Sequence, residues 1–383
     1  MSALLKPVAA VDPAVDLRFM DMALALGRRG LGNTWPNPAV GAVIVQPPGD
    51  GWGDWTVVGR GWTRPGGRPH AETEALARAG AAARGATLYA TLEPCSHVGK
   101  TPPCADAIIA AGIARVVSPL DDPNPEVAGR GHQRLRANGV AVTVGVGAEV
   151  ARRDHAGHLR RIADGRPHVL LKLAVSADGK AGLAGRRPVA ITGEAARARS
   201  HMLRATSDAI LIGIGTALAD DPALTCRLPG MIERSPVRVV LDSMLRLPLD
   251  GQLAETAADI PVWVFAAVDA PAERERALRQ RGIEVLRVGG DKNGRLDLDA
   301  VLRLLATMGI TRLMVEGGPT LAGVFAAADL VDEACIFRAA RVIGADGIDA
   351  LDERAWQALA THLEPDGAAE IVGADRLETY RRR

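Results

Sequence analysis

One histidine, one glutamate and two cysteines in the first third of the chain constrain its fold more than any other feature. His70 and Glu72 flank a single alanine, and Cys95, which follows a proline, precedes Cys104. A catalytic zinc ion takes three protein ligands and keeps its fourth position for water, so we expect His70, Cys95 and Cys104 to bind Zn²⁺. Glu72 is then free to move a proton between that water and a leaving amine. These residue types, although not the spacing of the two cysteines, are those of the H-x-E and P-C-x-x-C signature of base deaminases.

The spacing of the two cysteines departs from this signature. Residues 96–103 separate Cys95 from Cys104, whereas the general signature has two residues there. The longer insert still works if Cys104 begins a helix, and residues 105–111 read as one. The alternative is a structural zinc site, which has four protein ligands and no open position. His97 is the candidate fourth ligand for that alternative.

Strand and helix patterns alternate through the first half of the chain. Apolar runs predict strands at 40–45, 87–92, 114–118 and 140–146, and 56–61 reads as the return strand of a hairpin turning at 49–51. Helical spacing occurs at 19–28, with Asp16 as a possible cap, and at 72–83 and 133–138. His70 and Glu72 thus fall at the first turn of a helix, and Cys95 follows a strand.

The second half also predicts an α/β fold, with a largely parallel sheet. Strands are expected at 169–175, 209–212, 237–241, 262–265, 284–288, 313–315 and 334–337, and helices at 194–206 and 298–308. A length of 383 residues suits two domains. We expect them at 1–150 and 167–383, joined by a linker helix at 151–166 that ends near Gly165.

Two glycine turns follow strands in the second half, at 213–216 and 317–320. Such turns let backbone amides approach a phosphate at a helix start. Neither completes a Rossmann G-x-G-x-x-G motif, because Leu218 stands at the third glycine position. From spacing alone, each turn is either a phosphate cradle or a plain strand-to-helix connection.

Composition weighs against several classes of protein. The net charge at pH 7 is +1 and aromatic residues make up 3% of the chain, which disfavours a nucleic-acid base editor with a second, binding domain. No apolar run approaches the roughly 20 residues of a membrane span, and residues 1–10 are too weakly apolar for a signal peptide. The cysteine content fits a reducing cytoplasm. We expect a cytoplasmic homo-oligomer that acts on a small molecule, with no nucleic-acid or membrane partner.

The motifs around these residues resemble those of a known family. Residues 34–45, 70–72 and 94–104 are similar to the deaminase half of the bifunctional riboflavin biosynthesis family RibD, whose pattern includes the long insert between the cysteines. Residues 171–174, 176–180, 213–216, 219–227 and 315–318 are similar to its reductase half. The resemblance covers nearly the whole chain. It implies a cytidine-deaminase-like three-layer α/β/α domain followed by a dihydrofolate-reductase-like α/β domain.

The resemblance also implies two reactions and their site residues. Zinc hydroxide would deaminate 2,5-diamino-6-(5-phosphoribosylamino)pyrimidin-4(3H)-one, and NADPH would then reduce the ribosyl group of 5-amino-6-(5-phosphoribosylamino)uracil to ribityl. The residues that would contact the substrates are Asn37, His97, Lys100, Lys172, Arg204, Leu224, Arg227 and Glu316. Those that would contact NADPH are Ala174, Val175, Ala190, Thr216, Asp220, Ser243, Gly318, Pro319, Thr320 and Leu321.

The chemistry of three of these side chains supports the implied roles. Guanidinium groups pair with phosphate oxygens, which suits Arg204 and Arg227 to a ribose phosphate. Lys172 lies within an otherwise apolar strand, where a charge is costly unless an acid or a substrate pairs with it. The alternative for Lys172 is a strand-end lysine whose head reaches solvent.

Two segments depart from the family's pattern. Residues 186–190 read Arg-Arg-Pro-Val-Ala where the family usually has a serine and a tryptophan before Ile191, and residues 337–341 replace a usual Ala-Pro stretch. The missing tryptophan would contact the cofactor, and the missing serine the substrate. The alternative function is therefore an active deaminase fused to a degenerate reductase domain that only binds its ligand.

Overall fold

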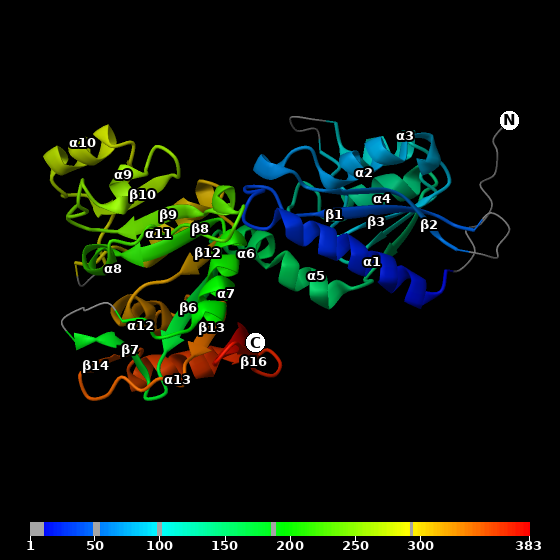
Figure 1. Ribbon diagram of the computed structural model, residues 1–383. Coiled ribbons are helices and arrows are strands. Elements are labelled where there is room, and N and C mark those ends of the chain that lie inside the picture. Colours follow the sequence, from blue (N-terminus) through cyan, green and yellow to red (C-terminus); the bar gives the residue numbers. More distant parts are fainter. Residues whose placement is uncertain (1–10, 49–53, 98–101, 185–188, 292–293) are drawn as a thin grey trace, which may run out of the picture. The chain divides into compact units, whose positions relative to one another are not determined.

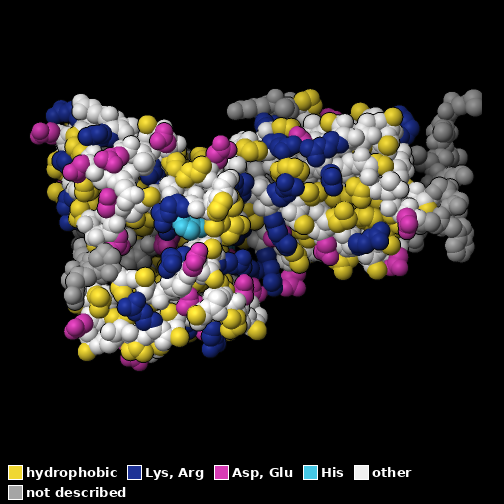
Figure 2. Space-filling model, viewed as in Figure 1, with side chains coloured by type: hydrophobic (Ala, Val, Ile, Leu, Met, Phe, Trp, Pro, Cys, Tyr) yellow, Lys and Arg dark blue, Asp and Glu magenta, His cyan; other side chains and the backbone are white. Residues whose placement is uncertain are grey.

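The computed structural model describes residues 11–48, 54–97, 102–184, 189–291 and 294–383. The chain divides into two units, Met1–Asp164 and Gly165–Arg383 (Figure 1). Within the described ranges, no helix has both the length and the apolar character needed to cross a membrane. Figure 2 shows basic and acidic side chains interspersed on the visible face of the second unit, in keeping with the near-zero net charge.

The first unit is built on a five-stranded sheet. Its strands are β1 (Gly41–Gln46), β2 (Thr56–Trp62), β3 (Thr87–Ala90), β4 (Arg115–Ser118) and β5 (Ala141–Val144), in the order β2-β1-β3-β4-β5. β1 pairs antiparallel with β2 and β3, while β3, β4 and β5 run parallel. The predicted hairpin of β1 and β2 is thus confirmed, and its expected turn at 49–51 lies outside the described residues.

Helices cover both faces of this sheet. They are α1 (Pro13–Gly27), α2 (Ala71–Ala79), α3 (Cys104–Ala110), α4 (Arg130–Ala137), α5 (Ala148–Asp154) and α6 (Ala156–Asp164). Figure 1 shows α1 and α5 on one side of the sheet and α2, α3 and α4 on the other, which is the expected three-layer arrangement. Covered on both faces, β1, β3 and β4 are buried along almost their whole length.

Glycine in β2 allows α2 to lie directly on the sheet. A Cβ atom at Gly61 would come within 2.4 Å of the carbonyl oxygen of Ala71, so a larger residue would push the start of α2 away. The buried side chains of α2 include Ala71, Ala75 and Ala79, and their small size also lets the helix lie close to β2. This packing fixes the segment that carries His70 and Glu72.

Two sequence predictions about this unit are wrong. Asp12 caps α1, accepting a hydrogen bond from the amide of Ala14 at 2.9 Å. Asp16 is buried instead, and both its carboxylate oxygens accept hydrogen bonds from Arg115 of β4, at 2.7 and 2.6 Å. The segment 151–166 contains the end of α5 and all of α6 rather than one helix, because the chain leaves helical geometry at His155.

The second unit is built on a ten-stranded sheet. Its strands are β6 (His168–Val175), β8 (Ala209–Gly213), β9 (Val237–Leu241), β10 (Val262–Ala267), β11 (Glu284–Val288), β12 (Arg312–Val315), β13 (Glu333–Arg338), β15 (Leu363–Pro365), β16 (Glu370–Val372) and β17 (Asp375–Arg382). The order is β11-β10-β9-β8-β12-β6-β13-β17-β15, and β16 also pairs with β17. The strands from β11 to β13 run parallel, which confirms the largely parallel sheet, and β17 joins antiparallel.

The remaining elements connect these strands. The helices are α7 (Glu194–Ala205), α8 (Ile214–Asp220), α9 (Gln252–Glu255), α10 (Ala272–Gln280), α11 (Leu298–Thr307), α12 (Pro319–Ala327) and α13 (Glu353–His362), and β7 (Lys180–Leu183) pairs with β14 (Gly347–Asp349). Both glycine turns lead from a strand into a helix, from β8 into α8 and from β12 into α12. Because β8 and β12 are parallel neighbours, the two turns open at the same edge of the sheet.

Candidate active sites

The structure brings His70, Cys95 and Cys104 together in the first unit. His70 precedes the first residue of α2, Cys95 follows β3, and Cys104 is the first residue of α3. The Nδ1 atom of His70 lies 3.3 Å from Sγ of Cys104 and 3.7 Å from Sγ of Cys95. The three possible ligand atoms lie within 4.8 Å of one another. Two sulfurs and one imidazole nitrogen at this separation fit the ligands that zinc takes.

The other predicted residues of this site differ in their placement. Glu72 is buried in the first turn of α2. The side-chain amide of Asn37 donates to the carbonyl of Gly67, just before His70, at 2.9 Å. His97 is not part of the three-residue ligand group, although its Nδ1 is buried with no hydrogen-bond partner in the described part of the chain. Lys100 lies outside the described residues.

Hydrogen bonds within the group set the pKa values of its thiols. Hydrogen bonds from Cys104 and His70 lower the pKa of Cys95 to about 4. The bond with Cys95, together with burial, raises the pKa of Cys104. Burial also raises the pKa of Glu72. The arrangement therefore favours a thiolate, the form of cysteine that binds metals.

Lys172, Arg204 and Glu316 form a network in the second unit. The ammonium of Lys172 donates to Oε1 of Glu316 at 2.9 Å, and Nε of Arg204 donates to Oε2 at 3.0 Å. All three side chains are largely buried, with 12 to 16% of their surface exposed. Lys172, within β6, is thus paired with an acid that follows the neighbouring strand β12, and its ammonium group does not lie in solvent.

Leu224 and Arg227 lie in the segment next to this network. The carbonyl of Thr225 accepts a hydrogen bond from Nη1 of Arg204 at 3.0 Å. Leu224 is buried and has a positive φ of 55°. Arg227 is exposed, and its backbone amide donates to Nδ1 of His201 at 3.3 Å.

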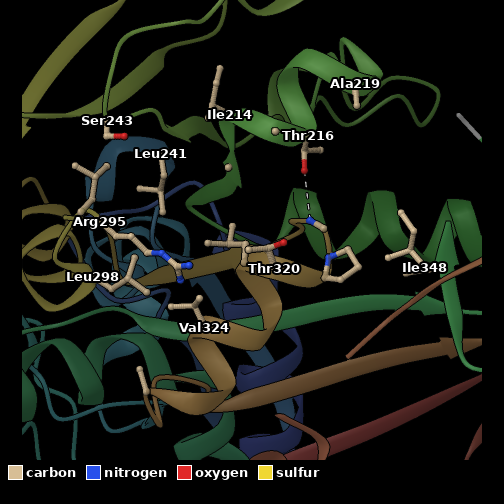
Figure 3. Close-up of a pocket in the computed structure, with 18 of the residues that line it drawn as sticks. Ile214, Thr216, Ala219, Leu241, Ser243, Arg295, Leu298, Thr320, Val324 and Ile348 are labelled. Carbon is tan, nitrogen blue, oxygen red and sulfur yellow. Dashed lines mark hydrogen bonds between the residues drawn. The ribbon is translucent and has the colours of Figure 1, made fainter. Parts of the chain in front are cut away.

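A pocket of about 990 Å³ lies at the two glycine turns. Seven of the residues expected to contact NADPH line it: Thr216, Asp220, Ser243, Gly318, Pro319, Thr320 and Leu321. The backbone amide of Gly318 donates to Oγ1 of Thr216 at 3.3 Å, which joins the two turns (Figure 3). The volume is typical of a cofactor site, and the turns supply backbone amides suited to phosphates.

The pocket has two ends with different side chains. Figure 3 shows Thr216 and Thr320 between Ile348 on one side and Ser243, Leu241 and Arg295 on the other. Arg246 also lines the pocket. Neither arginine was expected from the sequence, because each lies in a connecting segment without a motif.

Ala174, Val175 and Ala190 are not among the described residues that line the pocket. The carbonyl of Val175 accepts a hydrogen bond from the amide of Ala339, and that of Ala190 from Nη1 of Arg341. In the first segment that departs from the family's pattern, residues 186–188 lie outside the described ranges, whereas Val189 lines the pocket. In the second, Arg338 is paired with Glu378 at 2.8 Å.

Two protein families match the sequence, one in each unit. Residues 13–119 match the cytidine and deoxycytidylate deaminase zinc-binding region. Residues 167–371 match the RibD C-terminal domain. The expected pair of folds is thereby confirmed.

Whole-length relatives carry both parts. The riboflavin biosynthesis protein RibD of Escherichia coli is 38% identical over 380 residues, which cover 94% of this chain and 100% of that protein. The RibD of Bacillus amyloliquefaciens is 40% identical over 326 residues, 85% of each chain. The solved structure of Acinetobacter baumannii RibD, form 1, has a TM-score of 0.84 and 34% identity, and the match covers 97% of this chain and 100% of that one.

A second solved structure is similar over the same length. It is a diaminohydroxyphosphoribosylaminopyrimidine deaminase/5-amino-6-(5-phosphoribosylamino)uracil reductase from Thermotoga maritima. Its TM-score is 0.81 and its identity 32%, with 97% of this chain and 99% of that chain covered.

Proposed function

The chain belongs to the RibD family of riboflavin biosynthesis proteins, and we propose that the site residues described above carry out the deamination and the reduction. It has both enzymatic parts of the family, a zinc-dependent deaminase and an NADPH-dependent reductase. The observation that supports this most is the group of His70, Cys95 and Cys104, whose ligand atoms lie within 4.8 Å of one another. The same chain contains a reductase unit with a pocket that residues of both glycine turns line.

The first reaction is the deamination of 2,5-diamino-6-(5-phosphoribosylamino)pyrimidin-4(3H)-one. Zinc held by His70, Cys95 and Cys104 would lower the pKa of a bound water to roughly 7, so that hydroxide is present at neutral pH. The water oxygen would form a bond to the ring carbon and the C–N bond would break, while Glu72 would carry a proton of the water to the amino group, which leaves as ammonia and leaves a carbonyl on the ring. The burial of Glu72 suits this role, because bulk water does not compete for the proton.

The substrate of the first reaction carries a phosphate and several polar ring atoms. Asn37, His97 and Lys100 are the proposed contacts. The buried Nδ1 of His97, which has no hydrogen-bond partner among the described residues, favours a polar group of the substrate at that place, since a buried nitrogen without a partner is costly.

The second reaction reduces the ribosyl group of the deaminated product to ribityl. NADPH supplies the hydride. Lys172, Arg204 and Arg227 provide positive charge for the phosphorylated sugar, and Glu316 holds the first two in place. Leu224 completes the proposed substrate contacts.

The pocket at the glycine turns is the proposed NADPH site. The start of α12 offers backbone amides and a positive helix end to the pyrophosphate, with Thr216, Asp220, Pro319, Thr320 and Leu321 around it. Ser243 and Arg295 lie at one end of the pocket, and Arg246 also lines it, so a further phosphate of the cofactor would find positive charge there. Ala174, Val175 and Ala190 remain proposed cofactor contacts on the strength of the resemblance alone.

Domain boundaries belong to the same proposal. We expect residues 1–164 to fold alone and hold zinc, whereas a chain ending at 150 should not, because it lacks two buried histidines. Nε2 of His155 lies 2.8 Å from the carbonyl of Thr91, and Nε2 of His158 lies 3.0 Å from Asp122. Circular dichroism and zinc content of the two truncated chains would test this. If the chain 1–150 folds and holds zinc, the first domain ends at residue 150, as expected from the sequence.

The cellular setting is part of the proposal. The four cysteines are free thiols, which supports a reducing cytoplasm. A homo-oligomer that acts on a phosphorylated pyrimidine and on no nucleic acid or membrane completes the proposal, and light scattering of the purified protein would give the oligomeric state.

Metal analysis tests the zinc site directly. The purified chain should contain about one zinc per molecule, and Cys104→Ala should lose both the zinc and the release of ammonia from the diaminopyrimidinone. Oxidation of NADPH with the deaminated substrate should be unchanged in that variant, which controls for correct folding. Full zinc content in Cys104→Ala would remove this residue from the ligand set.

A further inference from the structure

Glu93 is buried next to the segment that carries Cys95, and backbone amides surround its carboxylate. The residue is 3% exposed. Each carboxylate oxygen accepts two hydrogen bonds. The donors are the amides of Asp122 (2.9 Å), Gly129 (2.8 Å), Gly131 (2.8 Å) and His132 (3.2 Å). These four bonds compensate the cost of burying the charge.

Glu93 also takes the place of a capping residue for α4. The first amides of a helix have no partner within the helix, and α4 begins at Arg130. Gly129, the residue before it, has no side chain with which to accept their hydrogen bonds. Glu93 comes from a segment 36 to 38 residues earlier than Gly129 and Gly131. Its negative charge suits the positive end of the helix.

The start of α4 also packs against the main chain of Pro94. A Cβ atom at Gly131 would lie 2.0 Å from the carbonyl oxygen of Pro94. Only glycine permits this approach. The residue immediately before Cys95 is therefore fixed by contact as well as by hydrogen bonds.

The start of α3 holds Cys95 from its other side. The amide of Cys104 donates to Sγ of Cys95 at 3.3 Å, and the amide of Ala105 donates to the carbonyl of Cys95 at 3.1 Å. The segment 93–95 is thus held between the starts of two helices. The position of the Cys95 sulfur depends on both.

A second metal site at Glu93 is the competing explanation, since ligand atoms of Glu93, Asp121 and His132 lie within 4.8 Å of one another. The hydrogen bonds argue against it. Four N–H groups point at the carboxylate of Glu93, and they would repel a cation. The ring of His132 is engaged at both nitrogens, with Asp121 at 2.8 Å and Ser118 at 2.7 Å. This cluster supports the main chain and does not bind a metal.

We propose that Glu93 is a positioning residue of the deaminase, which fixes the Cys95 thiolate for zinc by binding the start of α4. The inference rests on the proposed role of Cys95 as a zinc ligand. Groups that orient a metal ligand typically change metal affinity by roughly 10- to 100-fold when they are removed. Replacing Glu93 should therefore weaken zinc binding even in a protein that remains folded.

The test compares Glu93→Gln with the unchanged full-length chain. Glutamine keeps the size of the side chain, but it loses the charge and turns an amino group toward backbone amides. We expect zinc affinity, measured by competition with a chelator, to fall by about tenfold or more. We also expect the visible spectrum of the Co²⁺-substituted protein to change, because it reports the geometry of the cysteine ligands. NADPH oxidation with the deaminated substrate should stay the same.

Glu126→Gln is the matched control, since Glu126 is an exposed carboxylate in the segment between β4 and α4, which supplies backbone amides to Glu93. Its zinc affinity and Co²⁺ spectrum should equal those of the unchanged chain. If Glu93→Gln does not fold, Gly131→Ala takes its place, because it displaces Pro94 while leaving Glu93 intact, and the same loss is expected. A folded variant with unchanged zinc affinity and Co²⁺ spectrum would overturn the proposal. An unchanged chain that binds no zinc would instead overturn the proposed function.

Discussion

The ammonium of Lys172 lies 2.9 Å from Oε1 of Glu316. Lys172 lies within β6, and Glu316 directly follows β12, the parallel neighbour of β6. Arg204 donates a hydrogen bond to the other oxygen of the carboxylate. Burial alone would raise the pKa of Glu316, but the charges of Lys172 and Arg204 lower it to about 2. Glu316 is therefore ionised at neutral pH and keeps two cations together in the reductase unit.

Replacing Lys172 with methionine should impair reduction and leave deamination intact. A hydrogen bond to a charged partner contributes about 1.5–3 kcal/mol, so we expect a loss of about ten- to a hundredfold in the rate of ribosyl reduction. NADPH oxidation with the deaminated substrate measures it. Lys180→Met is the matched control, because Lys180 forms a more exposed pair with Asp349. Equal rates for Lys172→Met and the unchanged chain would remove Lys172 from the site.

The lowered pKa of Glu316 predicts how stability depends on pH. The pKa is about 2 in the folded chain against 4.5 for an ordinary glutamate, so ionised Glu316 stabilises the fold above the unfolded value and loses this contribution as pH falls through the folded value. We expect the difference in free energy of unfolding between the unchanged chain and Glu316→Gln to be constant at neutral pH. It should shrink between about pH 4.5 and pH 2. Denaturant unfolding at several pH values measures it, and a pH-independent difference would contradict the account.

Glu72→Gln should stop deamination without releasing zinc. Proton transfer by a positioned side chain contributes roughly 10²- to 10⁴-fold to a rate, and the ligand atoms lie on other residues. Ammonia release and zinc content measured on one sample test both parts. Glu74→Gln is the matched control, since Glu74 pairs with Arg64 and Arg78. Loss of zinc in Glu72→Gln would show that Glu72 holds the metal.

Arg246 and Arg295 should favour NADPH over NADH. Both line the pocket, and the acids Asp291 and Asp297, which also line it, already accept hydrogen bonds from backbone amides. Each arginine-to-alanine change should weaken NADPH binding by about tenfold or more and leave NADH binding nearly unchanged. Titration calorimetry gives both dissociation constants. Equal weakening for both cofactors would assign the arginines to a group that NADPH and NADH share.

The sequence predicted those parts of the molecule that local patterns encode. Apolar runs located the inner strands, and the start of α2 followed from the alanine-rich segment after His70. Asp16 shows the limit, because its partner Arg115 lies 99 residues away and a helix-capping role was an equally good reading of its position. The strands β15, β16 and β17 were missed, since β15 and β16 have only three residues each and β17 is rich in charged residues.

The candidate site was predicted where chemistry requires particular residue types at short spacing. His70, Cys95 and Cys104 belong to a signature, and the structure brings them together. Glu93 gives no such signal, because its partners are backbone amides of residues 122–132, which any sequence supplies. The pocket residues also depend on tertiary structure, since Ser243, after β9, and Arg295, after β11, line one pocket although they lie 52 positions apart in the sequence.

Product analysis with the diaminopyrimidinone substrate tests the central claim most directly. Without NADPH, the unchanged chain should release ammonia and accumulate 5-amino-6-(5-phosphoribosylamino)uracil. With NADPH, the same chain should convert this compound to its ribityl form, with one NADPH oxidised for each molecule. Accumulation of the ribosyl compound in the presence of NADPH, or recovery of unchanged substrate under both conditions, would contradict the account.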